Sequence, residues 1–177
     1  MNIEYRQLLN PDFSPDSRVW VYQSSRLFTL DEALVIEELL NSFTAHWMSH
    51  GMPVKAAAYL FFGQFIILMA DEGASGISGC STDSSVRLIK EIEQRFSVNM
   101  FDRITLAFFV NDKTGSYRVQ LLPLSQLQYA IDNGFISSDT LYFNNLVQTK
   151  EELEKKWIVP VKESWLLNII SLAKSVS

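Results

Sequence analysis

The chain is short of cysteine and positive charge, and each shortage excludes a class of function. With one cysteine among 177 residues it can form no internal disulfide, so Cys80 is either a small packed residue or a reactive thiol. The formal net charge of −5 removes the usual electrostatic basis for binding nucleic acid or an anionic membrane, because phosphate contacts need clustered Lys and Arg. We therefore expect neither nucleic acid nor a membrane as a partner.

Long apolar runs, low-complexity stretches and repeats are also missing. Residues 1–6 lack the basic start and apolar core of a signal peptide, and no apolar run reaches the length of a membrane span. We therefore expect a soluble, cytoplasmic protein. At 47% hydrophobic residues, the chain is long enough for one substantial core. The expectation is a single α+β domain over residues 1–177, with a core of about 18–122 and a C-terminal extension of about 123–177.

The first half of the chain has clear strand and helix patterns. Residues 18–25 alternate as a strand does, with apolar residues on both faces. Thr29 and Glu32 form a capping box before a helix that is expected to run to about residue 49. The next two apolar segments, 57–62 and 65–70, flank Gly63-Gln64, which predicts a hairpin with glycine at the first turn position.

The pattern continues with a helix over about 86–96 and strands over 104–110 and 117–122. The order strand, helix, strand, strand, helix, strand is that of the ferredoxin-like split βαβ sandwich. We therefore predict this fold, with an extra strand and a helical C-terminal extension in which Gly134 ends one helix and Thr149 begins another.

The predicted sheet has one face that its two helices do not cover. Trp20 and Tyr22 are expected on this face, and so much wet apolar surface is unfavourable. The C-terminal extension is the first candidate for the cover. A second copy of the chain, which would make a homodimer, is the other.

The loop 73–85 carries the most plausible chemistry. It leads Cys80 into a helix, and a thiol near a helix N-terminus is stabilised as thiolate. If the two helices run antiparallel, His46 and His50 approach Cys80 and either imidazole could act as its base. The candidate ligand- or anion-binding residues are Gly76, Gly79, Ser81, Asp71 and Arg26.

Each of these candidates has a structural alternative. Free cysteines are among the most buried residues, and no known hydrolase signature surrounds Cys80. His46 and His50 share a helix face as zinc ligands do, yet the chain has no other histidine, so we expect no metal and no cofactor. Arg26 and Arg103 could hold a ligand carboxylate or phosphate, or could form ordinary surface ion pairs.

Four segments resemble a small family of uncharacterised bacterial proteins: RVWVYQSSR at 18–26, SGCS at 78–81, FDR at 101–103 and FNNLV at 143–147. The likeness covers most of the chain, and the resemblance implies no established activity. Members often carry the name ABC transporter ATPase, and residues 66–72 resemble a Walker B strand. That activity needs a glycine-rich loop ending in Lys-Ser or Lys-Thr, and no glycine of this chain is followed by lysine. We therefore do not expect an ATPase.

Two hypotheses about function follow from the sequence. The first is a non-catalytic α+β binding or adaptor module for a small ligand or a protein, because fold alone does not confer chemistry. The second is a small enzyme in which Cys80 is the nucleophile and His46 or His50 the base.

Overall fold

The computed structural model describes residues 4–71, 79–111 and 117–169, and for residues 79–82 it describes the backbone alone. Helices and antiparallel sheets form two compact units, which confirms the α+β class. We call them the two-helix unit, Glu4–Asp102 with Leu146–Glu154, and the four-strand unit, the described parts of Arg103–Asn145 and Lys155–Ser177. The first boundary between the units, after Asp102, falls inside the predicted core of 18–122. Each unit has an apolar cluster of its own.

The sheet of the two-helix unit has three strands in the order β1-β5-β4, and all neighbours are antiparallel. The strands are β1 (Arg18–Gln23), β4 (Lys55–Phe61) and β5 (Phe65–Asp71). The central strand β5 is apolar on both faces, and its first six residues are buried. This burial requires a cover on each side of the sheet.

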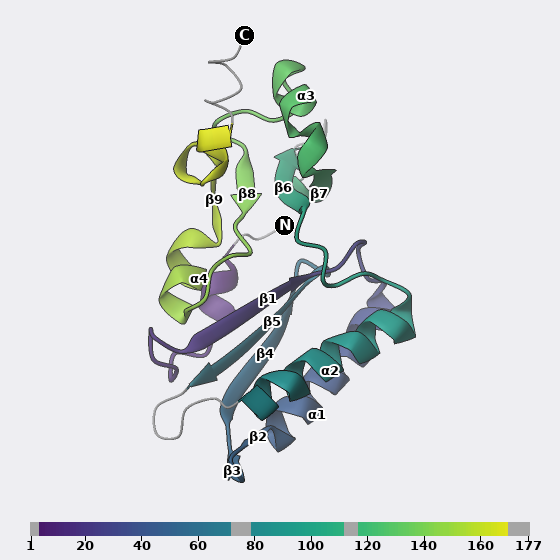
Figure 1. The fold of residues 1–177 in the computed structure, drawn as a ribbon, viewed down its shortest axis with the longest axis vertical. Coiled ribbons are helices and arrows are strands. Elements are labelled where there is room, and N and C mark those ends of the chain that lie inside the picture. Colours follow the sequence, from purple (N-terminus) through teal and green to yellow (C-terminus); the bar gives the residue numbers. More distant parts are fainter. Residues whose placement is uncertain (1–3, 72–78, 112–116, 170–177) are drawn as a thin grey trace. The chain divides into compact units, whose positions relative to one another are not determined.

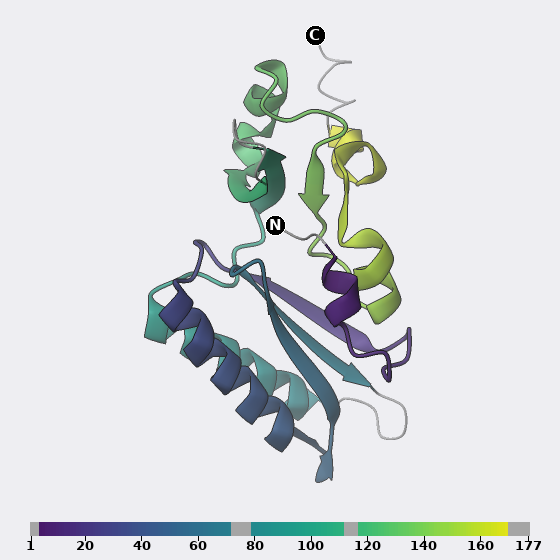
Figure 2. The same ribbon diagram turned by 180° about the vertical axis from the view of Figure 1, so that it is seen from behind.

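Two long helices, α1 (Leu30–His46) and α2 (Gly79–Phe96), lie side by side over one face (Figures 1 and 2). The predicted capping box is present, because the Glu32 N–H donates to Thr29 Oγ1 at 3.3 Å and the Thr29 N–H donates to Glu32 Oε2 at 2.9 Å. Helix α1 ends three residues earlier than expected. The chain instead enters a short hairpin of β2 (Met48–Ser49) and β3 (Met52–Pro53).

Trp20 and Tyr22 do not lie on the helix-free face of the sheet, where the sequence predicted them. Both pack in the cluster beneath the helices, together with Ile66 and Leu68, which lie directly opposite them on β5. The other face is covered within the same unit by the N-terminal lead-in with its 3-10 helix η1 (Tyr5–Leu8) and by the start of α4 (Lys150–Lys156). The Tyr5 ring lies 5.9 Å from that of Phe61, and its hydroxyl donates to the Leu153 carbonyl at 2.6 Å. The C-terminal extension therefore supplies only part of the cover.

The hairpin between β4 and β5 turns one residue earlier than predicted. The Gln64 N–H donates to the Phe61 carbonyl at 3.1 Å, so Phe62 and Gly63 are the central residues. Both have positive φ, 55° and 61°, as a type I′ turn requires. Glycine takes the second turn position because a left-handed backbone costs it nothing, while Phe62 bears the strain.

The four-strand unit contains the strand that was predicted to complete the ferredoxin-like sheet. β6 (Thr105–Asn111) pairs instead with β7 (Tyr117–Pro123) and with β8 (Leu141–Phe143), and the order is β7-β6-β8-β9. β9 is Ile158–Pro160. The correction has a physical reason: β6 buries Leu106 and Phe108 against apolar residues from 127–166, which the order of elements alone does not reveal.

Short helices cover one face of this second sheet. They are η2 (Leu124–Gln126), α3 (Leu127–Asp132) and η3 (Val161–Glu163). Gly134 follows α3 with φ +73°, so the predicted stop is confirmed.

Candidate functional site

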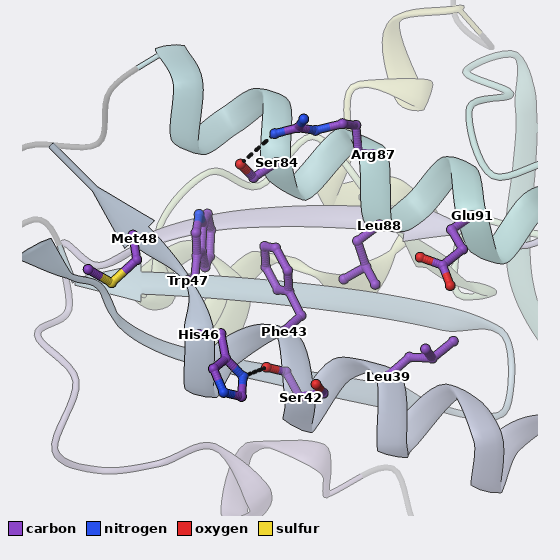
Figure 3. Close-up of a pocket in the computed structure, with 10 residues that line it drawn as sticks. All are labelled: Leu39, Ser42, Phe43, His46, Trp47, Met48, Ser84, Arg87, Leu88 and Glu91. Atoms are coloured by element: carbon purple, nitrogen blue, oxygen red, sulfur yellow. Dashed lines mark hydrogen bonds between the residues drawn. The ribbon is translucent and has the colours of Figure 1, made fainter. Parts of the chain in front are cut away.

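The helix pair of the two-helix unit borders an open groove of about 480 Å³ (Figure 3). One wall comes from the second half of α1 and the residues that follow it, and the other comes from the middle of α2. Its lining consists of Leu39, Ser42, Phe43, His46, Trp47, Met48, Ser84, Arg87, Leu88 and Glu91.

The inner part of the groove is aromatic. Phe43 lies in the last turn of α1 and Trp47 directly follows the helix, and their ring centroids are 4.8 Å apart. Trp47 is only 3% exposed, and its other neighbour is Trp20 of β1 at 5.9 Å. Tilted aromatic contacts of this kind hold the rings against the core. The floor is therefore rigid and apolar.

Polar side chains lie at the edge of the groove. The imidazole of His46 makes a 2.8 Å hydrogen bond to the Ser42 carbonyl through Nδ1, one turn earlier in α1. A carbonyl can only accept, so Nδ1 carries a proton, and in the neutral ring Nε2 has a free lone pair. On α2, Arg87 Nη2 donates to Ser84 Oγ at 3.1 Å (Figure 3).

The predicted histidines separate in the structure. His46 lines the groove, where the end of α1 meets the middle of α2. His50 is exposed in the turn between β2 and β3, with φ +50°, and does not line it. Gly76 lies outside the described residues. Gly79, Cys80 and Ser81 begin α2, and their side chains also lie outside the described part.

Arg26 forms an ion pair within the chain, which is the structural alternative to the ligand-binding role. Its guanidinium donates to both carboxylate oxygens of Glu32 at 2.8 Å and to the Phe96 carbonyl at the end of α2 at 2.7 Å. The hydrogen bond from Arg26, followed by that from the Thr29 N–H, lowers the pKa of Glu32 to about 2. Arg26 thus ties the start of α1 to the end of α2.

Asp71 is the last residue of β5, and Lys55 of β4 lies opposite it in the sheet. The two form an ion pair, with 3.3 Å between Asp71 Oδ2 and Lys55 Nζ. Lys55 also donates to the Asp12 carbonyl and lies 4.9 Å from the centre of the Phe13 ring. Asp71 and Arg26 are therefore not brought together with His46.

The sequence did not single out Ser84, Arg87 or Glu91 as site residues. One signal was available: positions 84, 87, 88 and 91 recur at the spacing of a single helix face. That spacing places them on one side of α2, but it does not tell which element they face.

Among the described residues there is no group of three or more His, Cys, Asp or Glu side chains that could hold a metal ion. Within the same part of the chain, no helix combines the length and apolar character that crossing a bilayer demands. Comparison with protein-family models, curated proteins and solved structures gives no match for this chain.

Proposed function

We propose that this protein is a non-catalytic binding or adaptor module whose α1–α2 groove receives an apolar side chain of a partner polypeptide. The observation that carries the proposal is the pairing of a rigid aromatic floor, Phe43 and Trp47, with a polar edge of His46, Arg87 and Glu91.

The shape of the groove favours a polypeptide over a small ligand. Small-molecule sites bury most of their ligand in an enclosed cavity, whereas this groove lies open along two helices (Figure 3). A partner segment needs only one or two anchor side chains in such a groove, and its backbone stays at the edge. Met48, 48% exposed beside the floor, adds an adaptable apolar contact.

The edge provides hydrogen-bonding groups of both kinds. His46 Nε2 accepts in the neutral ring, and Arg87 keeps donors besides the one directed to Ser84. The Glu91 side chain lines the same groove, and its carboxylate makes no hydrogen bond or ion pair within the described residues. A peptide presents both N–H and C=O groups, so this mixed edge fits it better than an edge of one charge.

The same proposal extends to the fold. We infer that the two-helix unit is a three-stranded form of the ferredoxin-like split βαβ arrangement. Support comes from the strand order β1-β5-β4 with two helices on one face, which lacks only the fourth strand.

The experiment that tests the binding function compares two tryptophan substitutions. Ser42→Trp fills the groove from α1, while Gln94→Trp adds the same side chain at an exposed position of α2 outside the groove. Random peptides displayed on phage are selected on the wild-type protein, and the enriched peptides are synthesised and titrated against all three proteins by fluorescence anisotropy.

We expect enriched peptides with a shared aromatic or aliphatic anchor, bound by the wild type and Gln94→Trp and at least about tenfold more weakly by Ser42→Trp. Equal melting temperatures would show that both variants fold. A selection that enriches no peptide, or peptides that bind Ser42→Trp as tightly as the wild type, would refute the proposed function.

One observation supports a second candidate, a cysteine-dependent enzyme. The Nδ1 proton of His46 is committed to the Ser42 carbonyl, and this leaves Nε2 as the basic atom in a groove lined by Ser84, one helical turn after position 80 of α2. In this alternative the Cys80 thiol transfers its proton to Nε2, and the thiolate attacks an electrophilic substrate.

Alkylation kinetics test this candidate. Mass spectrometry follows the modification of intact protein by iodoacetamide from pH 5 to pH 9, for the wild type and for His46→Asn. The candidate predicts fast alkylation near neutral pH and a profile displaced to higher pH in His46→Asn. Identical profiles for the two proteins would eliminate His46 as the base.

A further inference from the structure

The four-strand unit contains a larger hollow, of about 710 Å³, between its sheet and α3. It exists because the cover is shorter than the strands: a helix of six residues spans roughly 9 Å, whereas a strand of seven spans roughly 23 Å. In the described part of the chain, helix α3 and its flanking turns therefore do not cover the end of the sheet where Val110 faces Arg118.

The wall of this cavity is mostly apolar. Leu122 and Val110 are partly buried extensions of the core cluster, and Ile136 belongs to the cluster itself. Phe135, directly after the turn that ends α3, is 68% exposed and lines the same cavity. Its ring therefore adds accessible apolar surface to the wall of the cavity.

One cation lies on the apolar side of the sheet. Arg118 and Leu122 are four residues apart on β7, and alternation puts them on the same face. Leu122 packs in the core cluster, so this is the covered face. Within the described residues the Arg118 guanidinium makes no hydrogen bond or ion pair, and the described lining contains no carboxylate. Arg118 is exposed to solvent, so its guanidinium is solvated in the empty cavity and can pair with an anionic ligand that enters it.

Neutral hydrogen-bonding groups surround this cation. The Gln126 side chain and the Tyr129 hydroxyl line the cavity, and in the described part of the chain neither makes a hydrogen bond. Both can donate to an oxyanion that Arg118 holds.

We propose that this cavity binds an amphipathic small-molecule carboxylate, such as a medium-chain fatty acid. Its carboxylate pairs with Arg118 and accepts from Gln126 or Tyr129, and its apolar chain lies against Leu122, Phe135 and Ile136. This site is separate from the α1–α2 groove and does not depend on the function proposed for that groove.

The probes are decanoate and the uncharged decanol, titrated into the intact protein by calorimetry. The variants are Arg118→Gln and the matched control Arg103→Gln, which removes the same charge at an exposed position outside the cavity. Phe135→Ser removes an exposed part of the apolar wall and leaves the buried core intact.

We expect decanoate to bind the wild type and Arg103→Gln alike, and Arg118→Gln about tenfold or more weakly, because hydrogen bonds to charged groups are the strong ones. Decanol should bind the wild type and Arg118→Gln equally, and Phe135→Ser should weaken both probes. No heat with decanoate at millimolar concentration, or equal decanoate binding by Arg118→Gln and Arg103→Gln, would overturn the proposal.

Discussion

The two units cover their sheets in different ways, and the difference decides where each has a hollow. In the two-helix unit, helices of 17 and 18 residues lie over strands of six or seven, and the opposite face is also covered. The first six residues of its central strand are buried, and the groove lies outside the sheet, between the helices. In the four-strand unit the cover is short, and the cavity lies directly on the sheet.

The comparison teaches that a groove or cavity can form whether the helices cover a sheet face fully or only in part. A complete cover leaves a rigid apolar floor with polar groups at the helix edges. An incomplete cover leaves core residues partly exposed and places a charged strand residue, Arg118, beside them. The first arrangement favours a partner that lies across the surface, and the second favours a ligand that completes the core.

The largest expected effect is in the core of the four-strand unit. Phe108 is fully buried in the cluster of β6 and packs 5.6 Å from the Tyr142 ring of β8. Phe108→Ala removes most of the side chain and leaves a cavity, so it should lower the free energy of unfolding by about 3–5 kcal/mol. Hydrogen exchange read by mass spectrometry should show lost protection in β6 and β8. Unchanged protection there would contradict the view that this short-element unit depends on its core cluster.

The next largest loss of stability is expected at a buried lysine of the two-helix unit, on the side of the sheet opposite the helices. Lys150 is 7% exposed, donates to the Phe13 carbonyl at 2.9 Å and lies 3.7 Å from Glu154. Lys150→Met keeps the apolar stem but leaves that carbonyl unsatisfied, which should cost about 1–3 kcal/mol in urea unfolding. Lys150→Arg is the control, because it keeps a donor. A Met variant as stable as the wild type would show that the bond does not fasten the lead-in to the sheet.

A smaller effect is expected at the start of α1. Thr29→Ala removes the hydroxyl that accepts from the Glu32 N–H, and the expected loss is about 1 kcal/mol, measured by urea unfolding followed by circular dichroism. Thr29→Ser keeps the hydroxyl and should lose less than half as much. Equal losses in the two variants would indicate that the methyl group, and not the cap, is responsible.

The sequence predicted local features well because neighbouring residues determine them. The capping box at Thr29 and Glu32, the strands of the β4–β5 hairpin and the stop at Gly134 all depend on residues a few positions apart. The turn itself was displaced by one residue, because a positive φ at a bulky residue such as Phe62 is rare and no local pattern indicates it.

Features set by distant contacts were not predictable. β6 pairs with β8 through Phe108 and Tyr142, which are 34 positions apart, and no periodicity specifies that partner. The orientation of β1 was ambiguous because both of its faces are apolar. At the candidate site, His46 was identified by its residue type. Arg87 was not, because an exposed arginine on a helix is usually only a solvated side chain.

The smallest expected effect is a pH dependence at the ion pair that joins α1 to α2. The folded-state pKa of Glu32 is about 2, below its usual 4.5, first because of the hydrogen bond from Arg26. The charged carboxylate therefore stabilises the fold fully above about pH 4.5, and this contribution is lost as the pH falls toward 2. Glu32→Gln keeps the capping geometry but has no charge to titrate. As the pH falls between these values, the wild type should lose more stability than Glu32→Gln. The difference should be smaller than the loss expected for Thr29→Ala, because water screens an exposed ion pair. The measurement is urea unfolding at stepwise pH, and parallel curves for the two proteins would show that the pair contributes nothing to acid stability.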